Sequence, residues 1–275
     1  MAQRTRKNKG NKAEQEKSSP NTMMLVLGGV AVLAVAILIW NVVSTATDQT
    51  VRSPVEIEYD SPAELLQMAE PAVRGSADAP IIMMDFSDYS CPSCQAFTMQ
   101  SKPTLMRAYV DRGLMQFQYY DFPTGMFANS FTAARAARCA GDQDAYWPYH
   151  DVLFQRQSNW GTQADPNRTF EGYAQDLGLD QSAFRSCLRS DAHAEVVTAN
   201  LELARQLGVA GTPTLLLNTG EGTPTRVPDW RQMDQMRSLI DAAIERAGHT
   251  PPGSEPAAGQ DDSDEGDPDD GEEGA

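Results

Sequence analysis

The sequence predicts an α/β fold in which an all-helical insertion interrupts a sheet, preceded by one transmembrane helix. Three observations predict it: a long apolar run near the N-terminus, short apolar segments of strand length early and late in the remaining chain, and helical periodicity between them. The expected parts are a basic cytoplasmic arm at 1–20, a transmembrane anchor at 21–43, a linker at 44–60, a folded domain at 61–249 with its helical insertion at about 124–208, and a disordered acidic tail at 250–275.

The apolar run covers residues 23–40 without a polar side chain and continues to Val43. As a helix it spans about 31 Å, which matches the roughly 30 Å hydrocarbon core of a bilayer. Six Lys and Arg residues precede it within 1–20, so the N-terminus is expected to be cytoplasmic and the domain extracytoplasmic. The alternative is a cleaved secretory signal ending near 44–46, although signal cores usually have about 7 to 15 apolar residues. Either way the domain faces a compartment in which disulfides persist.

The charge distribution excludes one class of partner. The formal net charge is −16, and the segment 250–275 carries ten of the 38 acidic residues and no basic one, so an acidic excess also remains in the folded part. A nucleic-acid surface is not expected, because such surfaces are basic. The acidic segment lacks the spacing of a calcium-binding loop and is expected to stay solvated.

The first half of the domain is predicted to alternate helices and strands. Ser61 is an N-cap candidate, followed by Pro62 at the first helical position and Glu64 at the capping-box position, which predicts a short helix to about residue 69. The elements expected next are a turn between Gly75 and Pro80, a buried strand at 81–86, a helix from Cys91 to about Val110 with a kink at Pro103, and a strand at 114–120.

The second half is predicted to be a helical block followed by two strands and a final helix. From 126 to 207 apolar residues recur at spacings of three and four, with helices expected at 146–155 and 181–188. Strands are expected at 214–217 and, at the sheet edge, at 225–227. The last helix has one apolar face, formed by Trp230, Met233, Met236, Ile240 and Ile244.

The residues best suited to chemistry are the cysteines of Cys91-Pro92-Ser93-Cys94. Cys91 follows a predicted strand and begins a predicted helix, where a proline loses no hydrogen bond because the first helical N–H is unpaired in any case. The backbone N–H groups and the helix dipole at that position stabilise a thiolate and lower the cysteine pKa from about 8.5 toward roughly 3.5 to 7.5. Cys91 is therefore expected to be the nucleophile and Cys94, one turn on, the resolving thiol.

Two other interpretations of this pair stay open, a structural disulfide and half of a zinc site. Closing so short a loop adds little stability, which argues against the first. Zinc would need two further ligands at a recognisable spacing. No metal and no cofactor are expected, because the other candidate ligands do not occur at paired spacings: Cys139, Cys187, His150 and His193. The two histidines are instead expected to be packed or surface residues.

Two motifs separated by the helical block carry a family resemblance. They are Asp85-Phe86-Ser87-Asp88-Tyr89-Ser90-Cys91-Pro92-Ser93-Cys94 and Gly211-Thr212-Pro213-Thr214. Together they resemble the DsbA-like branch of the thioredoxin superfamily, and the resemblance covers about 75–248. It implies a thioredoxin-like fold with a helical insertion.

The resemblance also implies roles for single residues. Asp85, six residues before Cys91, is implied to be a buried acid that handles protons for Cys94. Thr212 and Pro213 are implied to form a cis-proline loop that packs against the cysteine pair. The residues implied to contact substrate are Thr212, Pro92 and Ser93.

The function that the resemblance implies is dithiol–disulfide exchange in reduced or unfolded exported proteins, with a quinone-linked membrane protein as redox partner. The expected direction is oxidation through a mixed disulfide on Cys91. Ser93 stands where strong oxidants of the family often have histidine. A disulfide reductase or isomerase therefore remains an alternative, as does a non-catalytic membrane-anchored binding domain.

The remaining cysteines, Cys139 and Cys187, fall in two different predicted helices. Outside the cytoplasm unpaired thiols are a liability, so a structural disulfide between them is expected. In the chain-entropy model it stabilises the fold by about 4 kcal/mol. The alternative is two separately buried thiols.

Overall fold

The computed structural model describes residues 20–46 and 50–252. The chain divides into two units, 1–49 and 50–275. The expected basic arm, apart from Pro20, and the acidic tail from residue 253 onward lie outside the described residues.

The first unit contains one helix, α1 (Pro20–Ala46). Its side chains are described from Met24 to Trp40, and all of them are apolar and exposed. Among the residues described, no helix combines the length and the apolar character that crossing a membrane requires.

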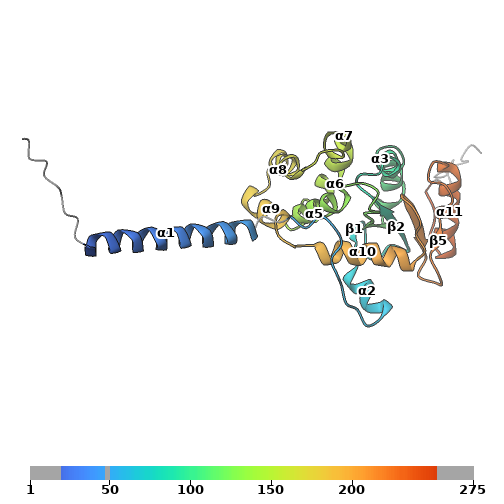
Figure 1. Cartoon of the computed structure of the whole chain (residues 1–275). Helices are drawn as coiled ribbons and strands as arrows, with labels where there is room; N and C mark the ends of the chain where they lie inside the picture. The colour runs from blue at the N-terminus through green and yellow to red at the C-terminus, as the bar shows by residue number, and fades with distance from the viewer. Residues whose placement is uncertain (1–19, 47–49, 253–275) are drawn as a thin grey trace, which may run out of the picture. The chain divides into compact units, whose positions relative to one another are not determined.

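The second unit is built on a five-stranded sheet with the strand order β1-β3-β2-β4-β5. Figure 1 labels β1, β2 and β5 of this sheet among the helices of the unit. β2 and β3 pair in parallel, and the other neighbours are antiparallel. Six of the seven residues of the central strand β2 are buried, as expected of a strand covered on both faces. The strands are β1 (Ala72–Arg74), β2 (Ile81–Ser87), β3 (Met115–Asp121), β4 (Thr214–Asn218) and β5 (Thr225–Arg226).

The connection from β2 to β3 is a helical segment of changing pitch. Pro103 lies in a short α-helical piece between two π-helical turns, and a proline cannot donate to the preceding turn. A kink was expected at this proline, and local widening of the helix is what the structure shows on both sides of it. The pieces are α3 (Pro92–Ala96), η1 (Phe97–Ser101), α4 (Lys102–Leu105) and η2 (Met106–Val110).

The block between β3 and β4 is helical throughout, as predicted. Helices α6 and α9 have the predicted bounds. The helices are α5 (Ser130–Gly141), α6 (Tyr146–Gln155), α7 (Gln157–Trp160), α8 (Asn167–Asp176), α9 (Gln181–Leu188) and α10 (Ala194–Gln206), and α11 (Met233–Arg246) follows the sheet.

Alternate residues of the central strands face two cores, because side chains of a strand point to opposite sides. Met84 and Phe86 of β2 join a smaller cluster with α10 and with α2 (Pro62–Met68). Met83 joins a larger cluster formed with the helical block, the α3–η2 segment and α11. The sheet is thus covered by helices on both faces.

Arg135 of α5 ties the chain before α2 to the helical block. Its side chain is buried, and the guanidinium donates to the carbonyl oxygens of Val51 at 2.8 Å and Ala192 at 2.8 Å. It also donates to the carbonyls of Cys187 and Ser190. A buried cation is tolerated where its donors are satisfied in this way.

Most expected elements are confirmed, and one strand was missed. Ser61 caps α2 by accepting from the Glu64 N–H at 3.2 Å, and the strand expected at 225–227 is present as β5. The missed strand is β1, three residues long, which exists only through its antiparallel pairing with β3. So short a strand carries no alternation from which it could be predicted.

Candidate active site

Cys91 stands at the junction of the central strand and the helix that follows it. It is the N-cap of α3, with Pro92 at the first helical position. The Asp88 carboxylate fixes the turn before it, accepting from the Ser90 N–H at 2.8 Å and from the N–H and hydroxyl of Thr124 at 3.1 and 3.2 Å. Both carboxylate oxygens of Asp88 are therefore paired although the side chain is buried.

The helical block also holds this turn. Gln157 of α7 donates from its side-chain nitrogen to the carbonyl oxygens of Tyr89 at 2.7 Å and Cys91 at 3.0 Å. Neither Gln157 nor Asp88 was predicted as a site residue. Their contacts join segments 36 and 66 residues apart, a separation that no local pattern reveals.

The thiol of Cys91 is set to ionise. A hydrogen bond from the Cys94 side chain lowers its pKa to about 5, assisted by a hydrogen bond with Thr212 and by the backbone N–H groups of Cys94 and Ser93, against the opposing effect of burial. The Sγ atom lies 3.7 Å from the Thr212 carbonyl oxygen. At neutral pH Cys91 is therefore a thiolate when reduced, which is the nucleophilic form.

Cys94 is shifted the opposite way. It is fully buried, and burial, followed by the hydrogen bond to Cys91, raises its pKa well above the ordinary value. Its Sγ accepts the Asp88 N–H at 3.5 Å. In the reduced pair, Cys91 is thus a thiolate that can undergo disulfide exchange, whereas Cys94 is a buried, protonated thiol.

Asp85 is buried in β2 and its charge raises the pKa of Cys94. Burial raises the pKa of Asp85 itself to about 7, against the lowering effects of the Ser87 hydroxyl and of the Lys102 charge. Ser87 donates to one carboxylate oxygen, and the other has no hydrogen-bond partner among the described residues. Asp85 can therefore gain or lose a proton near neutral pH within the interior.

The Thr212–Pro213 peptide bond is cis, as the resemblance implied. It places the Thr212 carbonyl against Cys91. A cavity of about 430 Å³ opens beside the two residues. Its walls are largely apolar and include Phe122, Met126, Phe127 and Val209.

A buried polar network lies behind the site. His150 is fully buried, with its two ring nitrogens 2.9 Å from the Tyr89 hydroxyl and 2.7 Å from the Lys102 amine. Burial lowers the pKa of His150 well below its ordinary value and also lowers the pKa of Lys102. Lys102 further pairs with Asp151 at 3.2 Å. The expectation that His150 is a packed histidine is confirmed, and Lys102 is a charged neighbour that the sequence did not indicate.

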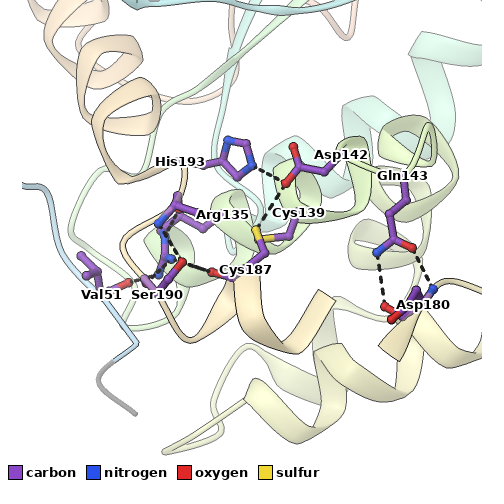
Figure 2. The surroundings of a disulfide bond; sticks show 10 residues. Val51, Arg135, Cys139, Asp142, Gln143, Asp180, Cys187, Ser190 and His193 are labelled. Atoms are coloured by element: carbon purple, nitrogen blue, oxygen red, sulfur yellow. Dashed lines mark hydrogen bonds and ion pairs between the residues drawn. A yellow bond between two sulfur atoms is a disulfide. The ribbon is translucent and has the colours of Figure 1, made fainter. Parts of the chain in front are cut away.

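The second cysteine pair joins two helices of the helical block (Figure 2). Cys139 of α5 and Cys187 of α9 form a disulfide with a Cα–Cα distance of 5.8 Å and a sequence separation of 48. Cys91 and Cys94 are free in the same structure. The chain therefore contains two cysteine pairs in different states.

These features match known proteins. A protein of Bacillus anthracis named "Probable disulfide bond formation protein D" is 25% identical over 228 residues, covering 81% of this chain and 97% of the relative. The crystal structure of Wolbachia pipientis alpha-DsbA1 superposes with a TM-score of 0.58 at 20% identity, covering 64% of this chain and 92% of that one.

Oxidised BdbD from Bacillus subtilis superposes with a TM-score of 0.56 at 21% identity, covering 64% of this chain and 96% of that one. At these identities the two structures show a shared fold. The family model described as thioredoxin matches residues 68–242, which include both cysteine pairs and the cis-proline loop. With more than half of its length matched by this model, the chain belongs to the thioredoxin family.

Proposed function

We propose that this chain is a protein thiol–disulfide oxidoreductase that works as an oxidase on reduced, unfolded exported proteins. The observation that carries the proposal is the opposite displacement of the Cys91 and Cys94 pKa values. An acidic Cys91 is a good leaving group and a stable thiolate, and both properties favour giving the disulfide away.

The reaction begins with the oxidised Cys91–Cys94 pair. A substrate thiolate attacks the Cys91 sulfur, forms a mixed disulfide with it and displaces Cys94, which takes up a proton. A second substrate thiolate then attacks the substrate sulfur of the mixed disulfide and releases Cys91 as the thiolate. The substrate loses two electrons and two protons, and the enzyme's cysteine pair is left reduced.

Asp85 handles the proton of Cys94 in this scheme. Its pKa of about 7 lets it carry a proton in a region where other acids would be ionised. Its role is to supply the proton as Cys94 leaves and to accept it when the pair is oxidised again.

The cavity beside Cys91 supports a broad choice of substrates. Its apolar walls bind unfolded segments without reading their sequence, and the backbone at Thr212 and Pro213 lies against the reacting sulfur. Pro92 and Ser93 follow Cys91 at the start of α3, and their proposed role is to contact the bound segment there.

The place of action is part of the proposal. The exposed apolar side chains from Met24 to Trp40 and the basic residues of 1–20 support a tether with the N-terminus in the cytoplasm and the domain outside. The name of the Bacillus anthracis relative supports a role in disulfide formation. Reoxidation falls to a quinone-linked membrane partner.

The test is the reduction potential of the Cys91–Cys94 pair. The full chain is equilibrated in glutathione buffers, and the state of each cysteine pair is mapped separately by alkylation and mass spectrometry. A potential nearer −120 mV than −270 mV supports the oxidase, since these values mark a strong oxidant and a thioredoxin-like reductase. A value near −270 mV would replace it with a reductase.

A second measurement tests the mechanism. Cys94→Ala removes the thiol that can attack the mixed disulfide and expel the substrate from Cys91. The variant is given a substrate protein activated as a mixed disulfide with a small thiol, so that Cys91 attacks the substrate sulfur and the small thiolate leaves. The adduct between Cys91 and the substrate should then accumulate and be recovered on non-reducing gels. Recovery of the adduct on any other cysteine contradicts the assignment of the nucleophile.

A further inference from the structure

The disulfide of the helical block is surrounded by further metal-binding side chains (Figure 2). The ligand atoms of Cys139, Cys187 and His193 all lie within 4.8 Å of one another. Asp142 completes the group, with its Oδ2 atom 2.9 Å from His193 Nε2 and 3.5 Å from Cys187 Sγ. Two sulfurs and one imidazole nitrogen therefore lie close together, with a carboxylate oxygen against the nitrogen and one of the sulfurs.

We propose that reduction of the Cys139–Cys187 disulfide converts this cluster into a zinc site with Cys139, Cys187, His193 and Asp142 as ligands. Zinc in proteins takes four such donors in a tetrahedron, with Zn–S bonds of about 2.3 Å and Zn–N bonds of about 2.0 Å. Tetrahedral bonding requires the two sulfurs to lie about 3.7 Å apart, a separation that side-chain rotation can reach once the bond is broken. The Asp142 Oδ2 atom already lies 2.9 Å from His193 Nε2 and 3.5 Å from Cys187 Sγ.

The exchange of a disulfide for a metal balances as follows. A dithiol reductant gives two electrons and two protons to the S–S bond and is itself oxidised to a disulfide, which leaves two thiols on the protein. Zn²⁺ then displaces the two thiol protons and binds the two thiolates. In the reverse direction a disulfide oxidant accepts two electrons from the thiolates and becomes a dithiol, the S–S bond forms again, and the zinc returns to solution.

The four ligands are carried by well-packed segments, so reduction need not scatter them. Arg135 donates to the carbonyls of Cys187, Ser190 and Ala192, and so fixes the turn between α9 and His193. His193 itself is the N-cap of α10. These contacts do not depend on the S–S bond.

The cluster has an entry path for an ion. Cys139 is buried at 1% exposure, whereas the side chains of His193 and Asp142 keep 26% and 51% of theirs. Both line a cavity of about 460 Å³ that also contacts Arg138. Because Arg138 is held by Asp121 at 2.6 Å, its charge is already balanced and does not repel a cation.

In the reduced chain, the metal would hold α5 to α9 in place of the disulfide. It would also keep two thiolates bound, and so unable to pair with Cys91 or Cys94 before the correct disulfide forms. The link between α5 and α9 would then be a disulfide in the oxidised protein and a zinc ion in the reduced protein.

The test uses the full chain carrying Cys91→Ala and Cys94→Ala, so that Cys139 and Cys187 are the only thiols and the outcome is independent of the proposed oxidase activity. The protein is reduced with a phosphine, and its Zn²⁺ binding is measured by competition with a chromophoric chelator. One equivalent is expected to bind in the reduced state and none in the oxidised state. Cobalt in place of zinc should show thiolate charge-transfer bands and the d–d bands of a tetrahedral site.

Matched variants separate this site from adventitious binding by two thiols. On the same background, His193→Ala should weaken zinc binding by about 100-fold or more, because even the partners of metal ligands contribute 10- to 100-fold. His249→Ala, which changes an exposed histidine, should leave it unchanged. Asp142→Asn should weaken it by about 10-fold.

Two results would overturn the proposal. One is the absence of stoichiometric zinc in the reduced protein. The other is equal zinc affinity in the His193→Ala and His249→Ala variants. Circular dichroism of the reduced protein with and without zinc is recorded alongside, since a chain that unfolds on reduction would bind zinc without regard to His193 and so give the second result.

Discussion

Cys91 and Cys94 lie three residues apart at the start of one helix, whereas Cys139 and Cys187 lie 48 residues apart and join two helices. A disulfide across a long loop removes much entropy from the unfolded chain, while one across a short loop removes little. The first pair can therefore be made and broken without unfolding the domain, and its surroundings are free to tune its reactivity. The comparison teaches that loop length and local electrostatics together divide the cysteines into a reactive and a bracing pair.

The largest expected effect comes from removing the nucleophile. Cys91→Ala should reduce thiol oxidation of a reduced, unfolded model protein to the uncatalysed rate, because no mixed disulfide can form on the enzyme. The matched variant Cys139→Ala with Cys187→Ala should keep its activity at a temperature where it stays folded. An equal loss of thiol-oxidation activity in both variants would contradict a catalytic role for the first pair alone.

The next effect is a difference in thiol reactivity within the first pair. In the reduced chain, alkylation by iodoacetamide should modify Cys91 with a half-maximal rate near pH 5, while Cys94 stays unmodified at neutral pH. Because the pKa of Cys91 is lowered from 9.0 to about 5 on folding, the reduced form should lose stability relative to the oxidised form as pH falls from about 9 to about 5. A half-maximal rate near pH 9 contradicts the assignment of Cys91.

Removing the bracing pair should change stability instead. Cys139→Ala with Cys187→Ala should lower the free energy of unfolding by about 4 kcal/mol in urea titrations, as the closed loop of this length predicts. Reduction of the Cys91–Cys94 disulfide in the otherwise intact protein serves as the control and should change it much less. If reduction of Cys91–Cys94 lowered the free energy of unfolding and the double variant did not, the first pair and not the second would stabilise the fold.

The raised pKa of Asp85 should make the free energy of unfolding depend on pH, with an effect no larger than that of losing the Cys139–Cys187 disulfide. Its pKa rises from 3.8 to about 7 on folding, so the folded state holds the proton more tightly and the oxidised wild type should lose stability as pH rises from about 4 to about 7. Asp85→Asn should remove that loss, up to about 4 kcal/mol. Urea titrations of the oxidised proteins at pH 4 and pH 8 measure the difference, and parallel pH profiles would refute it.

The smallest expected effect concerns Lys102, whose charge lowers the pKa of Asp85. Lys102→Met should move the Asp85 titration to higher pH by less than about one unit, read as a shift in the pH profile of the first exchange step, in which Cys94 leaves. Arg107→Met, which changes an exposed cation in the same segment, is the control. A shift to lower pH in Lys102→Met would show that another group sets the Asp85 pKa.

The sequence indicated those features that are local. The strands and helices repeat with their own periods, the motif with Pro92 places Cys91 at a helix start, and the resemblance supplied Asp85 and the cis bond at Pro213. Three features depended on contacts between distant segments and had no local signal. They are strand β1, the Asp88 and Gln157 contacts to the active-site turn, and the approach of His193 to the second disulfide.

The Lys102–His150 contact belongs with these. Each residue lies on an apparently ordinary helical stretch, and only the packing of α6 against the α3–η2 segment brings them to 2.7 Å. A lysine within a helical pattern is most often a solvated residue, so burial of this one could not be read from spacing.

The four carbonyls bound by Arg135 also decide where the chain can be cut. One of them belongs to Val51, and the adjoining Thr50 hydroxyl accepts from Asn167 at 2.9 Å. A fragment that begins at Ser61 would leave a buried guanidinium short of an acceptor, whereas one that begins at Thr50 keeps every contact of that side chain. The natural start for a truncated protein therefore lies eleven residues before Ser61, the N-cap of the first helix of the domain.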